Sequence, residues 1–223
     1  MPKITVIVSA YKDRGFLDEA ILSAKNQTFD DYEIILSSDG NWGLKDFAEK
    51  YGIGFCCSEK GNHSSALNNA VEMASGEWIK ECHDDDLLTP NCLIDLYEGR
   101  GGVLVYANAI NEYTKDSTEA RRLYYISNPN VTLENLLPLF VGQLHAATFM
   151  FRKDAFQNVG GFDPNIGYAE EYEFYINLLK HGYTFTYVPE TVALYRLHGD
   201  QITFKDKSLR GKMAEYITKK HNL

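Results

Sequence analysis

The sequence predicts an α/β fold with helices on the faces of a mostly parallel β-sheet, and three observations carry this prediction. The opening run ITVIVSAY, residues 4–11, is rich in β-branched residues, as expected of a strand buried on both faces. Strand-like and helix-like segments then alternate over the first 100 residues, which indicates βαβ units. Of the 223 residues, 44% are hydrophobic and 24% charged, so the chain can bury a sizeable core.

The expected elements of the first half follow in strand–helix order. After the first strand, residues 13–27 predict a helix, because apolar side chains recur along one stripe at Phe16, Leu17, Ala20, Ile21 and Ala24. Further strands are expected at residues 32–38, 52–58 and 76–82, and further helices at residues 44–51 and 64–75.

The alternation loosens after about residue 100. Strands are expected at residues 102–110, 146–153 and 192–198, and helices at residues 132–140 and from Ala169 onward. Thr132 is a suitable N-cap for the first of these helices. The polar segment 111–122 predicts a hairpin or a loop, and GGFDPN predicts a turn.

Charge and cysteine content exclude several classes of protein. The formal net charge of −9 argues against a nucleic-acid partner, which requires a basic face. Only the segment 205–223 concentrates cations; it could touch an anionic membrane surface, but a solvated terminal helix is the preferred interpretation. The cysteines are too few and too irregularly spaced for a disulfide framework or a zinc site, so free thiols are expected at Cys56, Cys57, Cys82 and Cys92.

The sequence predicts a cytoplasmic protein. Lys3 and Thr5 leave no long apolar stretch at the start, so no signal peptide is expected. The apolar runs are far shorter than the about 18 residues that a transmembrane span needs.

Polar groups follow three of the expected strands at the sheet edge where open α/β sheets bind ligands. They are Ala10-Tyr11, Ser38-Asp39-Gly40 and Asp84-Asp85-Asp86. No Gly-rich phosphate loop is present, so bound phosphates would need a metal ion, and Mg²⁺ and Mn²⁺ prefer carboxylates plus substrate phosphates. The alternative is a solvated turn in which Asp86 caps the following helix, and the residues alone leave both interpretations open.

A glutamate stands out in the helix expected from Ala169. At about 100° per residue, Glu171 projects within the apolar arc, whereas Glu170 and Glu173 fall on the opposite, polar face. The helix dipole should favour Glu171 as an anion, as a general base requires. A first-turn glutamate at the edge of the core is the alternative.

Arg196 and His198 would share one face of the strand 192–198. Together they could bind a diphosphate, or the histidine could complete a metal site. A structural or exposed histidine is the plainer alternative.

With these residues the chain resembles the family 2 glycosyltransferases of the GT-A fold, mostly inverting enzymes that use nucleotide-diphospho-sugars. The opening ITVIVSAYKDRGFLDEAILSAKNQTFDDYEIILSSDG is similar to the family patterns V-S-V-I-x-P-x-Y-N, S-x-L-x-Q-T and E-I-I-V-V-D-D-G-S. SSALNNAVEMASGEWIKECHDDDLLTP is similar to the segment that leads into the DxD region. FRKDAFQNVGGFDPN and AEEYEFYINLLKHGY are similar to the acceptor half, with its GGFDE and ED signatures.

A nucleotide-sugar site is expected from Ala10, Tyr11, Asp39, Asn68, Asp84 and Arg196. Ala10 and Arg196 are assigned from their strand positions, and the resemblance implies the other four. Tyr11 would lie against the base, and Asp39 would hydrogen-bond a uracil-like edge. Asn68 would lie in the helix that lines the site, and Asp84 would contact the ribose or the metal.

The resemblance also implies a metal site and a base. Asp85 would bind Mn²⁺ or Mg²⁺, and His198 lies where some members bring a histidine to the metal or the diphosphate. Glu171 takes the place of the second acidic residue of ED, the general base. The chain departs from the family pattern at Ser38 and His83, where aspartates are usual, at Asn177, where an arginine is common, and at Glu171 itself, which is one methylene longer than the usual aspartate.

One GT-A domain is therefore expected over residues 1–223, with a nucleotide-sugar-binding half at 1–100, an acceptor-binding half at 101–203 and a C-terminal helix or tail at 204–223. The implied activity is metal-dependent transfer of a sugar, with inversion, from a nucleotide-diphospho-sugar such as a UDP-sugar. The acceptor would be a glycan, a lipid-linked molecule or another hydroxyl compound.

Three other functions are alternatives. A non-catalytic sugar-nucleotide-binding module is the main rival because of the departures at Ser38, His83 and Asn177. A sugar-phosphate nucleotidyltransferase would normally carry a Gly-rich loop after the first strand, where SAYKDRG is a poor substitute. A glycoside hydrolase would need two opposed carboxylates.

Overall fold

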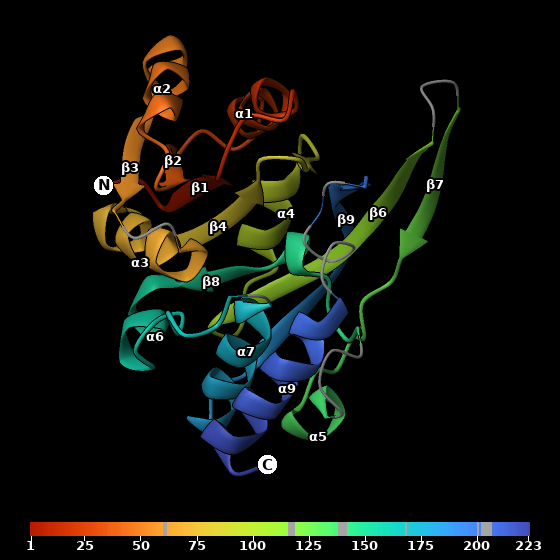
Figure 1. The fold of residues 1–223 in the computed structure, drawn as a ribbon. Helices are drawn as coiled ribbons and strands as arrows, with labels where there is room; N and C mark the ends of the chain where they lie inside the picture. The colour runs from red at the N-terminus through yellow and green to blue at the C-terminus, as the bar shows by residue number, and fades with distance from the viewer. Residues whose placement is uncertain (60–61, 116–118, 138–141, 168, 200, 202–206) are drawn as a thin grey trace.

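A nine-stranded β-sheet runs through the computed structural model, which describes the chain apart from residues 60–61, 116–118, 138–141, 168, 200 and 202–206 (Figure 1). Strands β3-β2-β1-β4 lie in that order and run parallel. They span Ile4–Ala10 (β1), Tyr32–Asp39 (β2), Gly54–Ser58 (β3) and Trp78–His83 (β4). The connecting helices are α1 (Leu17–Lys25), α2 (Lys45–Tyr51), which follows the 3₁₀ turn η1 (Trp42–Leu44), and α3 (His63–Met73). The α/β fold and the elements expected in the first half are confirmed.

The second half extends the same sheet with mixed strand directions. The order continues β8-β6-β9-β5, where β4 and β8 are antiparallel and β6 and β9 are parallel. These strands are β5 (Leu87–Leu88), β6 (Leu104–Lys115), β8 (Met150–Arg152) and β9 (Phe185–Leu197). The predicted hairpin is formed by β6 and β7 (Glu119–Tyr125), which projects from the body of the molecule in Figure 1.

Five further helices accompany these strands in the described residues. They are α4 (Cys92–Glu98), α5 (Leu133–Leu136), α6 (Lys153–Asn158), α7 (Glu170–Lys180) and α9 (Lys207–His221). The Thr132 side chain accepts from the Asn135 amide at the start of α5, so the predicted cap is confirmed. The strand expected at residues 146–153 is shorter than predicted. This segment contains the 3₁₀ turn η2 (Ala146–Thr148), the three residues of β8 and the first residue of α6.

Apolar cores cover both faces of the sheet because side chains alternate along each strand. On β1, Ile7 belongs to a core that includes Tyr175 of α7. Val6 and Val8 belong to the other core, together with Leu17 of α1. All of β1 is buried, which is the reason for its continuous apolar sequence.

Helix α9 is largely exposed, as expected of a solvated terminal helix, but one of its faces packs on α7 (Figure 1). Glu173 of α7 is fully buried, and its Oε1 lies 2.8 Å from Lys220 Nζ and 2.7 Å from His221 Nε2. Ile217 of α9 is also fully buried. The expectation of an exposed polar face at Glu170 and Glu173 is therefore wrong, because a helical projection contains no information about which later helix will cover that face.

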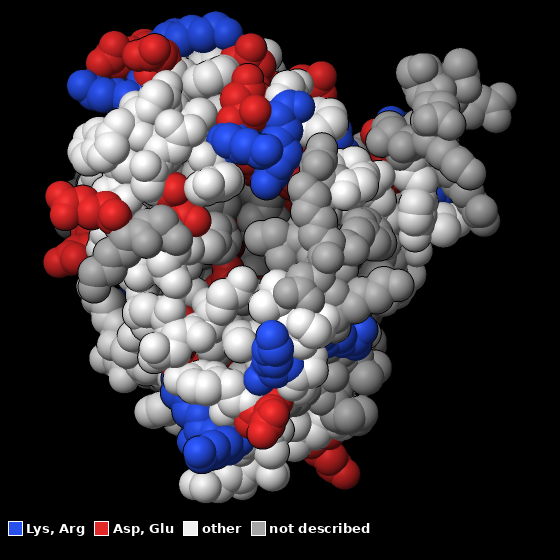
Figure 2. All heavy atoms as spheres, in the orientation of Figure 1, with Lys and Arg blue, Asp and Glu red and all other residues white. Residues whose placement is uncertain are grey.

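The thiol prediction is confirmed, since all four cysteines are free. Among the helices of the described residues, none combines the length and the apolarity needed to cross a bilayer. On the face drawn in Figure 2, acidic and basic side chains are interspersed and form no continuous basic surface over the described residues.

Candidate active site

The carboxyl ends of β1 and β4 meet at one edge of the sheet, as the parallel arrangement requires. Ser9 on β1 is in register with His83 on β4, and the Asp84 amide donates to the Ser9 carbonyl at 3.0 Å. The aspartate triplet therefore begins where β4 leaves the sheet, and α7 starts close by: Glu170 contacts His63, which also lies 3.5 Å from Glu81 of β4.

Each aspartate of the triplet faces at least one positive or donor group, and Arg14 lies near both Asp84 and Asp85. Arg14 reaches Asp84 at 3.0 Å, and His198 Nε2 lies 3.0 Å from Asp85 Oδ2. Asp86 Oδ1 accepts from the Arg196 backbone amide at 3.1 Å. Burial and the neighbouring Asp85 raise the pKa of Asp84 to about 6, although Arg14 opposes the shift. The mutual repulsion of three adjacent carboxylates is thus offset by partners from two other segments, the loop after β1 and the end of β9.

Asp86 does not cap the next helix, and that prediction is wrong. The chain continues as β5, and α4 begins only at Cys92 after Asn91. Asp86 is 1% exposed and instead fixes the end of β9 and the ring of His83, whose Nδ1 lies 3.3 Å from Asp86 Oδ2. A buried acceptor requires such donors, but β9 is more than 100 residues away in the chain and could not be foreseen.

Asp85 and His198 are placed so that one cation could be shared between them. The carboxylate and the imidazole nitrogen are 3.0 Å apart, and both side chains are largely buried, with 11% and 12% exposure. A carboxylate with an imidazole is a donor set that suits Mn²⁺, and carboxylates with substrate phosphates suit Mg²⁺. The residues therefore fit the expected metal.

Arg196 and His198 both lie against the Phe16 ring, as expected of positions two apart on a strand. The Arg196 guanidinium carbon lies 4.9 Å from the Phe16 ring centroid, and the His198 and Phe16 rings are 5.3 Å apart. The Arg196 guanidinium also pairs with Glu19 of α1. Its predicted contact with a diphosphate would therefore compete with this ion pair.

Glu171 lies in the first turn of α7, next to a residue with an unusual backbone. Ala169, which precedes the helix, has a left-handed conformation with φ of 55°, uncommon for a residue other than glycine. Glu171 is half-buried, whereas Glu170 is 8% exposed, so the burial of the two glutamates is the reverse of the expectation. Burial, followed by the charge of Glu170, raises the pKa of Glu171 and so opposes the stabilisation of the anion that was expected from the helix dipole.

A second polar cluster lies beside these residues. His63, at the start of α3, and His83 both direct Nε2 toward Glu81 Oε1, at 3.5 and 3.4 Å. His63 Nδ1 contacts Glu170, and Ser9 donates to Glu81 Oε1 at 2.7 Å. We call His63, Glu81 and His83 the histidine–glutamate cluster.

The groups of this cluster strongly shift one another's pKa. Burial would raise the pKa of Glu81, but His83 and His63 outweigh it and lower the pKa to about 2. Burial would lower the pKa of His63, but Glu170 and Glu81 outweigh it and raise the pKa to about 9. Such perturbed groups at the ligand-binding edge of a sheet are typical of functional sites.

The predicted base-binding residues lie at the neighbouring strand ends. Tyr11 is 58% exposed beyond β1, and Ala10 is buried at its end. Asp39 ends β2; burial raises its pKa, and its Oδ1 has no hydrogen-bond partner among the described residues. Ser38, which replaces a family aspartate, exchanges hydrogen bonds with the Asn41 backbone and so shapes the turn after β2.

Asn68 holds the GGFDPN turn. Its side-chain amide donates to the Phe162 carbonyl at 2.8 Å, and its oxygen accepts from the Phe162 amide at 2.9 Å. Besides its predicted contact with the nucleotide, the side chain of Asn68 therefore has a structural use in the backbone of this turn. Asn177 likewise donates to the Val159 carbonyl at 2.9 Å.

Asn68→Ala is expected to lower the free energy of unfolding by about 1–3 kcal/mol, because the Phe162 backbone groups lose their partners. Urea unfolding followed by circular dichroism measures this change. Asn69→Ala, one residue further along α3 and exposed, is the matched control and should change stability little. Equal stability of the two variants would contradict the assigned role of Asn68.

Sequence reasoning missed Arg14, His63, Glu81 and Glu170 as parts of the site. Glu81 carried a usable signal, because a carboxylate two residues before His83 points to the same face of a strand that is otherwise buried. Arg14 and His63 carried none: Arg14 lies in the loop after β1 and His63 is the first residue of α3, and the direction of both side chains depends on tertiary packing.

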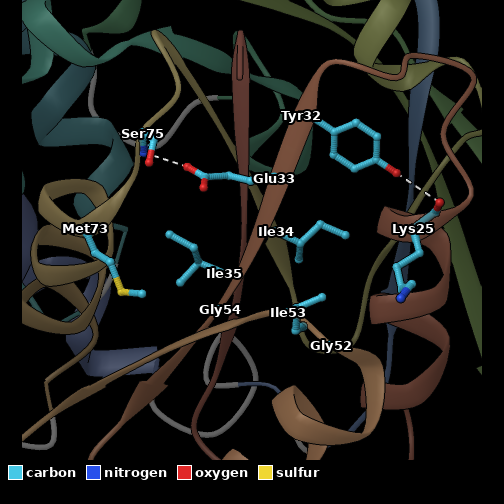
Figure 3. A pocket seen from close by; sticks show the side chains of 10 residues that line it. All are labelled: Lys25, Tyr32, Glu33, Ile34, Ile35, Gly52, Ile53, Gly54, Met73 and Ser75. Carbon is cyan, nitrogen blue, oxygen red and sulfur yellow. Dashed lines mark hydrogen bonds between the residues drawn. The ribbon is translucent and has the colours of Figure 1, made fainter. Parts of the chain in front are cut away.

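A separate pocket lies at the opposite end of β2 (Figure 3). It has a volume of about 560 Å³ and includes Glu33, Ile35, Gly54 and Met73 in its lining. Glu33 is already engaged, since it accepts from Thr5 and from the Ser75 amide. The pocket is distant from the carboxyl edge of the sheet, so we do not assign the active site to it.

Comparison with known sequences places the chain among related proteins. The sequence model of the family described as "Glycosyl transferase family 2" matches residues 5–160. An uncharacterised glycosyltransferase of Rickettsia typhi is 27% identical in an alignment of 216 residues that covers 91% of this chain and 66% of that protein. The hyaluronan synthase of Pasteurella multocida is 25% identical over 222 residues, 95% of this chain and 22% of that protein. The chain thus spans less than two thirds of the length of these relatives.

Solved structures share the fold. Staphylococcus aureus TarS 1–349 in complex with UDP-GlcNAc superimposes with a TM-score of 0.69 at 16% identity, covering 92% of this chain and 61% of that one. The mannosyltransferase PcManGT from Pyrobaculum calidifontis, in complex with GDP-Man and Mn²⁺, superimposes with a TM-score of 0.61 at 16% identity, covering 86% of this chain and 56% of that one.

Proposed function

The chain belongs to glycosyl transferase family 2, and from this premise we propose that it transfers a sugar from a nucleotide-diphospho-sugar to an acceptor hydroxyl with inversion. The observation that carries the proposal is the placement of Asp39, the Asp85–His198 pair and Glu171 around one sheet edge. The family model matches residues 5–160 and so does not include Glu171 or His198. Their proposed roles rest on the geometry and on the resemblance described above.

Glu171 is the proposed general base. Its raised pKa favours this role, because a base works best when its pKa lies near the operating pH. The carboxylate takes the proton of the acceptor hydroxyl while that oxygen attacks the anomeric carbon. The bond from that carbon to the diphosphate oxygen breaks, and the nucleoside diphosphate leaves with the electron pair.

The donor is held by groups at the strand ends. Tyr11 lies against the base, and the carboxylate of Asp39 accepts a hydrogen bond from it. Asp85 and His198 would hold Mn²⁺ or Mg²⁺, which supplies positive charge to the leaving diphosphate. Asp84, released from Arg14, contacts the ribose or the same ion, which leaves the Arg14 cation free to face the phosphates.

Relatives and structural neighbours support a UDP-sugar as donor and a glycan as acceptor. TarS was solved with UDP and with UDP-GlcNAc, and the Pasteurella relatives are hyaluronan and chondroitin synthases. GDP-Man is the competing donor because PcManGT was solved with it. We propose a cytoplasmic protein that takes part in polysaccharide synthesis.

A panel of nucleotide-sugars tests the proposal by thermal shift. At 100 times Kd, a bound donor adds about 2.7 kcal/mol, which corresponds to about 5–10 °C for a chain of this size. UDP-GlcNAc, UDP-glucose and GDP-Man are compared with and without Mn²⁺, and the free sugars serve as controls. We expect a UDP-sugar to raise the Tm only with Mn²⁺. The absence of a shift with every nucleotide-sugar would contradict the proposal, and a shift without any hydrolysis or transfer would favour the non-catalytic binding module.

A further inference from the structure

The transfer proposed above does not use the histidine–glutamate cluster, although its geometry is that of a metal site. The Nε2 atoms of His63 and His83 lie 3.5 and 3.4 Å from Glu81 Oε1. These distances exceed the about 2.7–3.2 Å of N–H···O hydrogen bonds. They are close to about 3.4 Å, the distance between two ligand atoms around a tetrahedral ion with bonds of about 2.0–2.1 Å. One ligand atom from each residue lies within 4.8 Å of the others.

The other nitrogen of each imidazole faces a second carboxylate. His63 Nδ1 contacts Glu170, and His83 Nδ1 lies 3.3 Å from Asp86 Oδ2. Protein metal sites commonly use this outer shell, because a carboxylate on one ring nitrogen fixes the tautomer that turns the other lone pair to the ion. The arrangement occurs here on both histidines, which come from different elements.

Charge and access also suit a dication. Glu81, Glu170 and Asp86 are each 8% exposed or less and bring three negative charges around two imidazole rings. A divalent ion bound in place of the protons on the two Nε2 atoms would keep these buried charges balanced. The side chains of His63 and His83 are 35% and 28% exposed, which leaves a path for the ion and room for a fourth ligand from solvent.

We propose that His63, Glu81 and His83 bind one divalent cation of the zinc class, at a site separate from the Asp85–His198 pair. Two imidazoles and one carboxylate are ligands that suit Zn²⁺, Co²⁺ or Ni²⁺ better than Mg²⁺ or Ca²⁺. The ion would join β4 to the start of α3. Because His63 contacts Glu170, the ion would also hold the first turn of α7, which carries the proposed base Glu171.

Titration with Co²⁺ tests this proposal in the absence of nucleotide and acceptor, so its outcome is independent of the proposed reaction. The full chain, without an affinity tag and freed of metal with EDTA, is titrated with CoCl₂ while visible absorption is recorded. Tetrahedral Co²⁺ absorbs far more strongly in the visible than the hexaaqua ion. We expect these bands to saturate at one equivalent and to disappear when one equivalent of Zn²⁺ is added.

Variants locate the site. His63→Ala and Glu81→Gln should abolish the bands, and Glu170→Gln, which alters only the outer shell, should weaken Co²⁺ binding about 10–100-fold. The double variant Asp85→Ala, His198→Ala should keep the bands, because it removes only the metal site proposed for the donor. His181→Ala, which removes an exposed histidine, is the matched control and should bind like the wild type.

Circular dichroism and the Tm of each metal-free variant show whether it is folded. His63 is half-exposed at the first residue of α3, so its truncation should leave the fold intact. The proposal is overturned if the wild type gives no tetrahedral bands, if folded His63→Ala keeps them, or if the Asp85→Ala, His198→Ala variant loses them.

Discussion

Glu171→Gln is expected to slow sugar transfer by about 10²–10⁴-fold, the usual contribution of general acid–base catalysis. The amide has nearly the shape of the carboxyl group but accepts no proton from the acceptor hydroxyl. Because burial raises the pKa of Glu171, the neutral side chain should be tolerated and the fold should remain intact. Donor affinity should be unchanged, since the proposed base contacts the acceptor and not the nucleotide.

Transfer assays with the donor identified by the panel, together with calorimetric donor binding, measure both quantities. Glu72→Gln makes the same chemical change at an exposed position of α3 and should transfer at the wild-type rate. Undiminished transfer by Glu171→Gln would rule out its role as the base. An equal loss of donor binding would instead place Glu171 in the nucleotide site.

Asp85→Ala is expected to abolish Mn²⁺-dependent binding of the donor. Loss of a direct ligand should weaken the metal more than the about 10–100-fold typical of outer-shell residues, so the variant in Mn²⁺ should bind donor as the wild type does in EDTA. His198→Ala should reduce the same affinity, and the double variant should be no worse than Asp85→Ala because both residues serve one ion.

Calorimetric titration of the donor with Mn²⁺ and with EDTA measures these affinities. Asp30→Ala, at an exposed position on the loop before β2, is the matched control. Equal donor affinity of the wild type in Mn²⁺ and in EDTA would contradict the metal assignment. Full additivity of the two variants would show that Asp85 and His198 do not share an ion.

Asp84, Asp85 and Asp86 illustrate what a linear motif conveys. Their position after a buried strand placed them at the ligand-binding edge, which is where they lie. Their partners could not be predicted from the sequence. Arg14 comes from the loop after β1, and His198 and Arg196 come from the end of β9. The separate use of each carboxylate therefore depends on contacts between segments more than 60 residues apart.

The helix that carries Glu171 also shows that contacts with distant segments cannot be predicted from a local sequence pattern. Its apolar stripe was read correctly, since Phe174, Tyr175 and Ile176 are fully buried. The burial of its glutamates was not, because α9 covers Glu173 and His63 of α3 covers Glu170. A projection gives the direction of a side chain, whereas the covering element decides whether that direction leads to water.

The α/β fold, the order of the first elements and the strand ends at which polar residues gather all follow from the sequence alone. Hydrophobic periodicity and strand–helix alternation are local properties, and they are sufficient for that much. That His83, a departure from the family pattern, joins His63 and Glu81 in one cluster follows from the packing of the folded chain. Ligand geometry is a property of distances between side chains, and those distances exist only once β4, α3 and α7 have packed together.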